Sequence, residues 1–354
     1  MSEWKTVRLG DVCEKGASNI TQNEIVDNFG EYPIYGAAGF IKNVDFYKQE
    51  EAYIGIVKDG AGVGRISIHP AKSSLIGTMQ YIFPNENIDI KFLASFLKYQ
   101  NLGRFYTGAT IPHIYFKDYK NIKLKLPPLE TQKQIAAVLD KCTSLISKYK
   151  KILEKYDTLI KSRFIEMFGE NPVESGKWKV EKFKNICLLI TDGEHTTPQR
   201  CTQGIYLLSA RNVLNHKLQL DNVDYIDESE YQRIAKRIVP QENDILLSCS
   251  GSVGRVCVVP KGLKFQLVRS VALLRLKKDV NPIFMEHLIT SDHIQTQIEK
   301  SKTQSSQANL FQGKIAELIG FLPPLYLQND FASFVQQIDK SKFEIEKIVK
   351  MGYN

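Results

Sequence analysis

Several polar segments of this chain contain residue types that can do chemistry, but none has the spacing of a catalytic centre. Asp192-x-Glu194-His195 offers two carboxylates and an imidazole to a metal ion, yet no second cluster with ligand spacing accompanies it. Gly60-x-Gly62-x-Gly64 lacks the following helix and the Gly-Lys-Ser/Thr sequence of a phosphate-binding loop. We therefore expect no catalytic residue, no metal and no cofactor in this chain.

The length of the chain favours more than one domain, and its net positive charge is compatible with a polyanionic partner. With 354 residues, two or more domains are expected. Lys and Arg exceed Asp and Glu by 47 to 39, a net charge of +8. The six cysteines contain no Cys-x-x-Cys pair, which argues against a zinc site or a disulfide framework. We find no signal-peptide core and no run of 18 apolar residues, so we expect a cytoplasmic protein without a membrane span.

A long helix is predicted over residues 129–168, and the rest of the chain is organised around it. Pro127 and Pro128 precede it, and Thr131-x-x-Gln134 matches the capping-box pattern of a helix N-terminus. The segment contains no Gly or Pro, and Gly169 is expected to end it. Such a helix would be about 60 Å long, which is far more than a connector inside one compact domain needs. It is typical of a spacer.

Apolar and semi-apolar residues recur along this helix in steps of three and four, the pattern of a coiled-coil seam. They are Ile135, Val138, Cys142, Leu145, Tyr149, Ile152, Tyr156 and Leu159. A second long helix is predicted after Leu322-Pro323-Pro324-Leu325, with a seam at Phe331, Phe334, Ile338, Ile345 and Ile348. We expect the two helices to bury these stripes against each other. The alternative is that each helix packs on its nearest domain.

The chain repeats itself, because four landmarks occur twice in the same order. They are residues 4–13 and 178–187, residues 60–65 and 250–255, residues 108–114 and 305–310, and the two Leu-Pro-Pro-Leu signals. This pattern predicts two copies of a globular domain followed by a long helix. The loops between landmarks differ, which favours a scaffold that reads two different targets.

Each half is predicted to be α+β. In the first half, strands over 52–57 and 65–68 flank the glycine-rich turn, and a helix follows at 90–100. In the second half, strands over 244–248 and 255–259 are followed by one helix over 282–299. The predicted domains are 1–125, 126–170 (helix), 171–321 and 322–354 (helix).

These motifs together resemble a known family. Trp-x-x-Val-x-Leu-Gly-Asp, the repeated Gly-Arg turn, Leu-Pro-Pro-Leu-Glu-x-Gln-x-x-Ile and Asp-Gly-x-His-x-x-Pro are similar to the specificity (S) subunit of type I restriction-modification systems. The resemblance covers essentially the whole chain. It implies two target recognition domains held apart by two long antiparallel coiled-coil helices. The second helix run, residues 325–351, is shorter than the first, which is a departure from the family pattern.

The resemblance also implies partners. The chain would recognise a bipartite, asymmetric site on double-stranded DNA and dock two methyltransferase subunits through its helices, and through them restriction/translocase subunits. S-adenosylmethionine, ATP and Mg²⁺ would belong to those partners. Alternatives are a type IIB specificity subunit, a self-sufficient DNA methyltransferase or nuclease, and a coiled-coil adaptor. Asn281-Pro282-Ile283-Phe284 differs from the methyltransferase motif Asn-Pro-Pro-Tyr/Phe at its third position, which argues against the enzyme.

If DNA is the ligand, phosphates require cations and backbone N–H groups, whereas bases require directed polar side chains. The phosphate candidates are Lys58, Arg65 and Arg255. The base-reading candidates are Tyr35, Thr110 and His113 in the first domain and His195, Thr196, Thr197, Arg200, Ser306, Gln307 and Asn309 in the second. The alternative for the Gly-Arg pairs is that the turn and a salt bridge require them. For the helices, the candidate partner-binding residues are Ile135, Val138, Leu145, Ile152, Leu159, Phe331, Phe334, Ile338 and Ile345.

Overall fold

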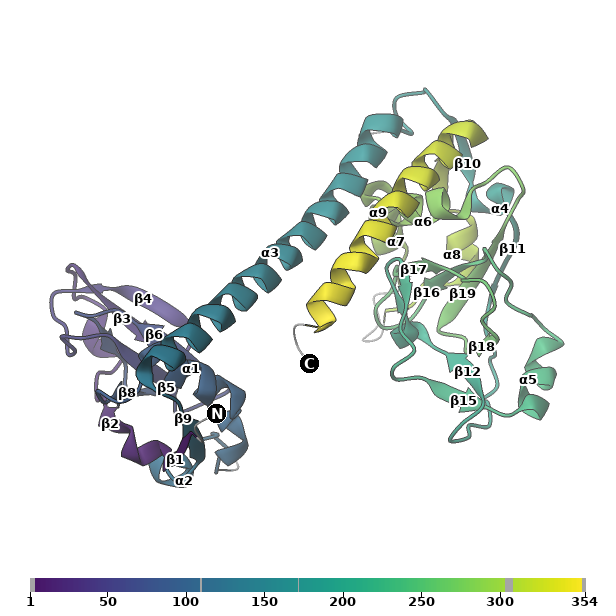
Figure 1. Ribbon diagram of the computed structural model, residues 1–354. Coiled ribbons are helices and arrows are strands. Elements are labelled where there is room, and N and C mark those ends of the chain that lie inside the picture. Colours follow the sequence, from purple (N-terminus) through teal and green to yellow (C-terminus); the bar gives the residue numbers. More distant parts are fainter. Residues whose placement is uncertain (1–3, 109, 171, 303–307, 352–354) are drawn as a thin grey trace. The chain divides into compact units, whose positions relative to one another are not determined.

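The computed structural model describes residues 4–108, 110–170, 172–302 and 308–351 (Figure 1). The chain forms two compact units, Met1–Lys148 and Tyr149–Asn354. The boundary falls inside the long helix α3 (Leu129–Phe168), which is a single helix of 40 residues. No described helix combines the length and the apolar character that a membrane span requires.

The first unit is built on two small sheets. A four-stranded antiparallel sheet has the order β2-β8-β5-β6, and a three-stranded sheet has the order β4-β3-β7 with β3 and β7 parallel. Two further strands, β1 and β9, pair antiparallel. The bounds are β1 Lys5–Arg8, β2 Cys13–Ala17, β3 Tyr32–Gly36, β4 Gly39–Val44, β5 Tyr53–Val57, β6 Ile66–His69, β7 Ser74–Leu75, β8 Met79–Pro84, β9 Lys123–Leu126, α1 Ile90–Tyr99 and α2 Phe116–Tyr119.

The core of the first unit lies between the four-stranded sheet and α1. Asp89 caps α1 by accepting hydrogen bonds from the backbone N–H groups of Lys91 and Phe92. Leu93 and Leu97, four residues apart on one face of this helix, are fully buried against the sheet. The predicted strands and helix of this half are therefore confirmed.

The second unit repeats this topology. Its four-stranded sheet has the order β11-β19-β16-β17, and its three-stranded sheet β15-β12-β18 again contains one parallel pair. The bounds are β10 Lys179–Lys182, β11 Cys187–Asp192, β12 Ile205–Leu208, β13 Val213–Leu214, β14 Lys217–Leu218, β15 Asp224–Ile226, β16 Ile245–Ser248, β17 Val256–Val258, β18 Phe265–Leu267, β19 Val271–Leu276, β20 Ile319–Leu322, α4 Phe183–Ile186, α5 Glu228–Ala235, α6 Pro282–Thr290, α7 Asp292–Ser301, α8 Gln312–Ala316 and α9 Leu325–Met351. Each strand of the four-stranded and three-stranded sheets matches one in the first unit, so the predicted duplication is confirmed.

One predicted helix of this half is wrong. The structure breaks residues 282–299 at Ser291, whose backbone is extended, into α6 and α7. The Ser291 hydroxyl donates to the Leu288 carbonyl oxygen at 2.6 Å, and the Ser291 carbonyl accepts from the backbone N–H of Gln295. A serine that satisfies backbone groups in this way competes with continuous helix.

Within the second unit, the end of α3 and α9 run antiparallel (Figure 1). Ring centroids of Phe164 and Phe331 lie 5.3 Å apart, and further along the pair the Lys342 ammonium lies 2.7 Å from the Asp157 carboxylate. Gly169 ends α3 with a positive φ of 100°, as predicted. The predicted fold class, α+β domains with two long antiparallel helices, is confirmed.

The predicted register of the helix seam is partly wrong. Ile160 and Phe164 form the buried face of α3, whereas Ile152 and Leu159 are 36% and 45% exposed. In the first unit, Val138 and Leu145 are likewise 59% and 50% exposed, and Ile135 is half-buried. Two apolar rows run side by side along α3, and periodicity alone cannot say which one is covered. On α9 the prediction is right for four of five residues, since Phe331 is buried and Phe334, Ile338 and Ile345 are half-buried, but Ile348 is 48% exposed.

The predicted capping box is also wrong. The helix begins at Leu129, so Thr131 lies inside it, and Gln134 is exposed. The anchor is instead the fully buried Gln132, whose side chain donates to the Pro127 carbonyl at 2.8 Å and accepts from the Asp89 backbone N–H at 2.9 Å.

The second long helix has the same anchor. Gln328, 1% exposed, donates to the Pro323 carbonyl at 2.8 Å and accepts from the Asn281 backbone N–H at 2.8 Å. Asn281 in turn caps α6, which accounts for the Asn-Pro segment noted in the sequence.

Candidate functional site

The glycine-rich turn between β5 and β6, residues 58–65, and the segment before α2 that contacts it form a polar surface, which we call the tip of the first unit. Gly64 has a φ of +84°, and a Cβ there would lie 2.2 Å from the backbone nitrogen of Gly103, so only glycine fits. The chain segment that precedes α2 is held against this turn, because the Ile114 N–H donates to the Lys58 carbonyl at 3.0 Å. The repeated glycine therefore has a structural reason.

The predicted residues of the first unit occupy this tip in different ways. Arg65 is exposed, and its guanidinium donates to the Ala37 carbonyl at 3.0 Å. Lys58 is half-buried and Thr110 is exposed. His113 is half-buried and forms an ion pair with Asp59, and its ring lies 4.1 Å from that of Tyr115.

Tyr35 belongs to a different segment from the turn. It lies on β3, half-buried, and packs against a buried aromatic cluster, with its ring centroid 4.4 Å from that of His69. Its surroundings are those of a core aromatic, and its role in base reading stays a prediction.

In the second unit, five of the predicted polar residues line one cavity of about 700 Å³. The segment after β11 supplies one wall, with His195, Thr196, Thr197 and Arg200. Asn309 lies opposite on a segment held to the end of β16, because the Leu310 N–H donates to the Cys249 carbonyl at 2.9 Å. Ser306 and Gln307 lie outside the described residues.

Asp192 is the hydrogen-bonding centre of this cavity. Its carboxylate accepts from Arg237 Nη2 at 2.7 Å, from Gln312 Nε2 at 2.5 Å and lies 2.9 Å from His195 Nε2. Gly193, which follows it, has no room for a Cβ, because that atom would lie 2.3 Å from the Leu267 carbonyl oxygen. The Asp-Gly pair therefore sets the position of the wall.

A second carboxylate, Glu194, is a largely buried residue of the cavity lining. It accepts from the Thr196 backbone N–H at 2.8 Å, and Arg233 lies 3.6 Å away. Burial alone would raise the pKa of Glu194, but hydrogen bonds from Thr196 and the nearby arginine charges hold it below its ordinary value. Both carboxylates are thus paired with arginine cations, which argues against the metal site considered for this segment.

The cavity lining contains polar residues that were not predicted from the sequence. Arg269 is an exposed residue of the cavity lining. Gln312, the first residue of α8, also lines the cavity, and its side chain donates a hydrogen bond to Asp192. Arg200 is partly neutralised, since its Nε lies 3.1 Å from Asp224, which Arg211 also contacts at 2.8 Å. Arg269 follows a buried strand without any local motif, so only the fold could locate it.

Arg255, at the second Gly-Arg turn, is half-buried, and its backbone N–H donates to the Ser248 hydroxyl at 2.9 Å. Among the described residues, neither Arg65 nor Arg255 forms an ion pair with a carboxylate. The salt-bridge explanation for the repeated arginines is therefore not supported in the described part of the chain.

Comparisons with known proteins agree with the duplicated fold. The family model described as "Type I restriction modification DNA specificity domain" matches residues 1–155 and 176–350. The chain is 25% identical over 402 residues to the type I restriction enzyme MjaVIII specificity subunit of Methanocaldococcus jannaschii, covering 99% of this chain and 91% of that protein. It is 24% identical over 294 residues to the EcoKI specificity subunit of Escherichia coli, covering 75% and 62%.

Among solved structures, the type I restriction-modification S subunit from M. genitalium matches with a TM-score of 0.64 at 14% identity, covering 99% of this chain and 93% of that one. At this identity the match supports the fold. Together with the two family-model matches, which span most of the sequence, it leads to one conclusion. The chain belongs to the family of type I restriction-modification DNA specificity domains.

Proposed function

We propose that this chain is the non-catalytic subunit that reads the DNA sequence for a type I restriction-modification complex, and that each compact unit reads one part of a bipartite, asymmetric site. One observation carries this proposal. The two units share their strand order but present different side chains at equivalent positions of their tips. The family model names type I systems, so the type IIB alternative is not favoured.

The cavity of the second unit has the chemistry of base recognition. Arginine pairs with the acceptor edge of guanine, and glutamine or asparagine pairs with adenine, through two hydrogen bonds each. Arg269, Gln312 and Asn309 line the cavity and supply these groups. Lys58, Arg65 and Arg255 at the two turns would contact phosphates, which position the protein on the duplex without reading sequence.

The exposed apolar row on α3 supports a docking role. Val138, Leu145, Ile152 and Leu159 are each at least one-third exposed, seven residues apart along the helix. Two modification subunits would bind the long helices there, and restriction subunits would join through them. S-adenosylmethionine, ATP and Mg²⁺ would be bound by these partners, and the length of α3 would influence the unread gap of the target.

A domain exchange tests the reading role. Residues 1–125 are replaced by the corresponding part of another specificity subunit, and the chain is co-expressed with its modification subunit. Mapping methylated adenines across the host genome should show one half of the target changed and the other half unchanged. The reciprocal exchange of residues 171–321 should change the other half. A change of both halves by one exchange would overturn the assignment.

A charge placed on the exposed row tests docking. Leu145→Lys should reduce co-purification with the modification subunit at least 10-fold and leave the thermal unfolding of the chain unchanged, because Leu145 is half exposed. Ser147→Lys adds the same charge at an exposed position two residues away and is the matched control. Equal losses in both variants would argue against this row as the docking surface.

A further inference from the structure

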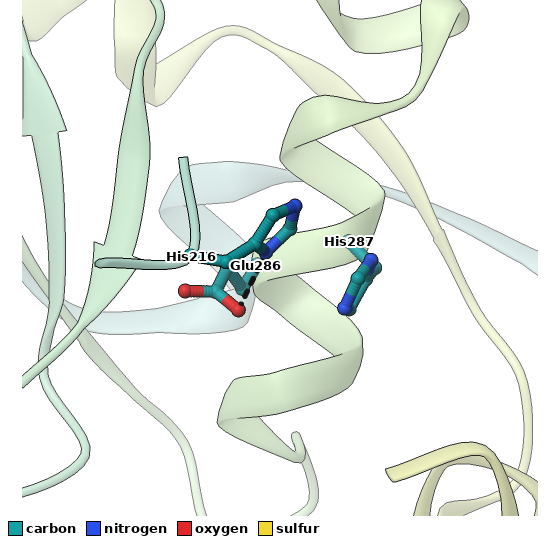
Figure 2. Close-up of side chains that lie close together, drawn as sticks. All are labelled: His216, Glu286 and His287. Atoms are coloured by element: carbon teal, nitrogen blue, oxygen red, sulfur yellow. Dashed lines mark hydrogen bonds and ion pairs between the residues drawn. The ribbon is translucent and has the colours of Figure 1, made fainter. Parts of the chain in front are cut away.

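A second group of chemically reactive side chains lies in the second unit, away from the candidate cavity. His216 occupies the turn between β13 and β14, and Glu286 and His287 are consecutive residues of α6 (Figure 2). One ligand atom from each residue can be chosen so that the three atoms lie within 4.8 Å of one another. This is the only such group of three or more His, Cys, Asp or Glu residues within the described parts of the chain.

The backbone holds His216 firmly in place. Its φ of 62° is in the left-handed region, which histidine rarely adopts. Its backbone N–H donates to the Val256 carbonyl at 2.9 Å, and the side chain of the preceding Asn215 accepts from the Val256 N–H at 3.2 Å. The hairpin turn is therefore fastened to β17, and the imidazole faces α6.

Glu286 presents a buried carboxylate to this imidazole. Its side chain is 8% exposed, and one oxygen accepts from the Val258 backbone N–H at 2.9 Å. The other oxygen lies 2.9 Å from Nδ1 of His216. A buried carboxylate is costly unless a cation or several donors compensate it. No lysine or arginine in the described residues forms an ion pair with Glu286, so a cation bound beside His216 would compensate this buried carboxylate.

His287 completes the group from the same helix. Its ring stacks on that of His216, with the ring centroids 4.3 Å apart. Its ring centroid also lies 5.2 Å from that of Phe331 on α9. A neutral imidazole offers a ring-nitrogen lone pair, which is the form that binds a metal.

We propose that His216, Glu286 and His287 form a binding site for a divalent transition-metal ion, with Zn²⁺ as the best match, which fastens the β13–β14 turn to α6. Two imidazoles and one carboxylate are a common zinc ligand set, and nitrogen ligands disfavour Mg²⁺ and Ca²⁺. The Glu286 oxygen that accepts from Val258 would keep that bond and orient the carboxylate. His216 is exposed, which leaves the fourth position open to water.

The geometry requires one ligand to rearrange, because the ring of His287 is stacked on that of His216. Ligand atoms of a tetrahedral zinc site lie roughly 3.3 Å apart, since each is about 2.0–2.1 Å from the metal. His216 Nδ1 and Glu286 are already at 2.9 Å, so the ion would take the place of the proton between them, which is released. His287 needs to rotate toward them. Lys342, whose charge acts on His287, is paired with Asp157 at 2.7 Å, which reduces its repulsion of the ion.

Titration with Co²⁺ and then Zn²⁺ tests this site in the full-length chain, prepared without a histidine tag and treated with a chelator. Co²⁺ should bind with one equivalent and produce visible absorption bands that Zn²⁺ abolishes. His216→Ala changes an exposed side chain and should weaken binding at least about 10-fold. Glu286→Gln keeps the shape and the Val258 hydrogen bond, and it should weaken binding by a similar factor. His293→Gln alters a half-buried histidine outside the group and should have no effect.

Circular dichroism establishes that each variant is folded before titration. Saturable binding of one equivalent that is lost in His216→Ala and Glu286→Gln, but kept in His293→Gln, supports the site. Binding that is absent in the wild-type chain, or equal in wild type and His216→Ala, overturns it. The measurement involves no DNA and no partner, so its outcome is independent of the proposed function.

Discussion

The two units share one strand topology, and they differ where the chain is exposed. The residues that anchor the long helices are the same, Gln132 in one unit and Gln328 in the other, with the same hydrogen-bond pattern. At the tips, equivalent backbone bridges join Asp59 to His113 and Ser250 to Asn309. The same backbone geometry thus presents an ion pair in one unit and polar uncharged side chains in the other.

The second unit also carries additions. The β13–β14 hairpin and α5 have no counterpart among the described residues of the first unit. α5 supplies Arg233 to Glu194 in the cavity lining, and the hairpin supplies His216 to the proposed metal site. The comparison teaches that packing and anchoring residues were retained after duplication, whereas surface chemistry diverged by substitution and by insertion.

The largest effect is expected at the shared glycine-rich turn. Gly64→Ala should lower the free energy of unfolding of the first unit by roughly 3 kcal/mol, because the new Cβ would clash with the Gly103 backbone in addition to the positive-φ cost. Gly254→Ala should cost less, since its Cβ would meet the flexible end of the Gln295 side chain at 2.8 Å. Urea denaturation, with the hydrogen exchange of amides in each unit as the readout, would measure both changes in the free energy of unfolding.

Gly60→Ala is the matched control for this turn. It also has a positive φ of 88°, but no atom lies within 4 Å of a Cβ there, so the cost should be about 1–2 kcal/mol. Equal costs at Gly60 and Gly64 would show that the close approach to Gly103 is unimportant.

The buried glutamines should contribute equally in the two units. Gln132→Ala leaves the Pro127 carbonyl and the Asp89 N–H without their partner, at a cost of about 2–3 kcal/mol. Gln328→Ala should cost a similar amount, because its bonds are equivalent. Hydrogen exchange at the N-termini of α1 and α6 would locate each loss. Gln134→Ala, an exposed position on α3, should change the free energy by less than about 0.5 kcal/mol.

A buried histidine, His69, should make the stability of the first unit more sensitive to acid than that of the second. Burial lowers the pKa of His69 to about 4, whereas the second unit has Val259 at the equivalent place in its turn and strand. Between pH 6.5 and 4 the unfolded chain binds a proton that folded His69 does not, so stability falls as the pH falls through this window. The first unit should be about 2 kcal/mol less stable at pH 5 than at pH 7 on this account.

His69→Val copies the residue of the second unit and should remove this part of the acid sensitivity. Hydrogen exchange of the β5 amides at the two pH values provides the measurement. The same decrease in stability in wild type and variant would assign the acid sensitivity to other groups.

The smallest effect is expected for a single base-reading candidate. Arg269→Ala should weaken specific DNA binding by the assembled complex by about 1 kcal/mol and relax the half of the target read by the second unit. Lys58→Ala should weaken binding to all sequences alike, because phosphate contacts carry no sequence information. Competition binding with targets altered in one half would separate the two. Relaxation of the other half by Arg269→Ala would break the assignment of one unit to one half.

Local patterns and the repeat were enough to predict most of the fold. The β5–β6 hairpin, α1 and the end of α3 at Gly169 follow from turn glycines, apolar spacing and a helix stop that act over a few residues. The break at Ser291 was missed, because serine tolerates a helix interior and only the surrounding packing showed that it ends one.

The sequence by itself determined that the chain is duplicated, that two long helices follow two α+β domains, and which loops carry polar side chains. Only the tertiary structure decided which row of α3 is buried, that Arg269 joins the loop of His195 and Asn309 in one cavity, and that His216 meets α6. The physical reason is distance along the chain. Secondary structure depends on neighbours a few residues apart, whereas a seam, a cavity or a ligand set depends on contacts between segments that the sequence holds far apart.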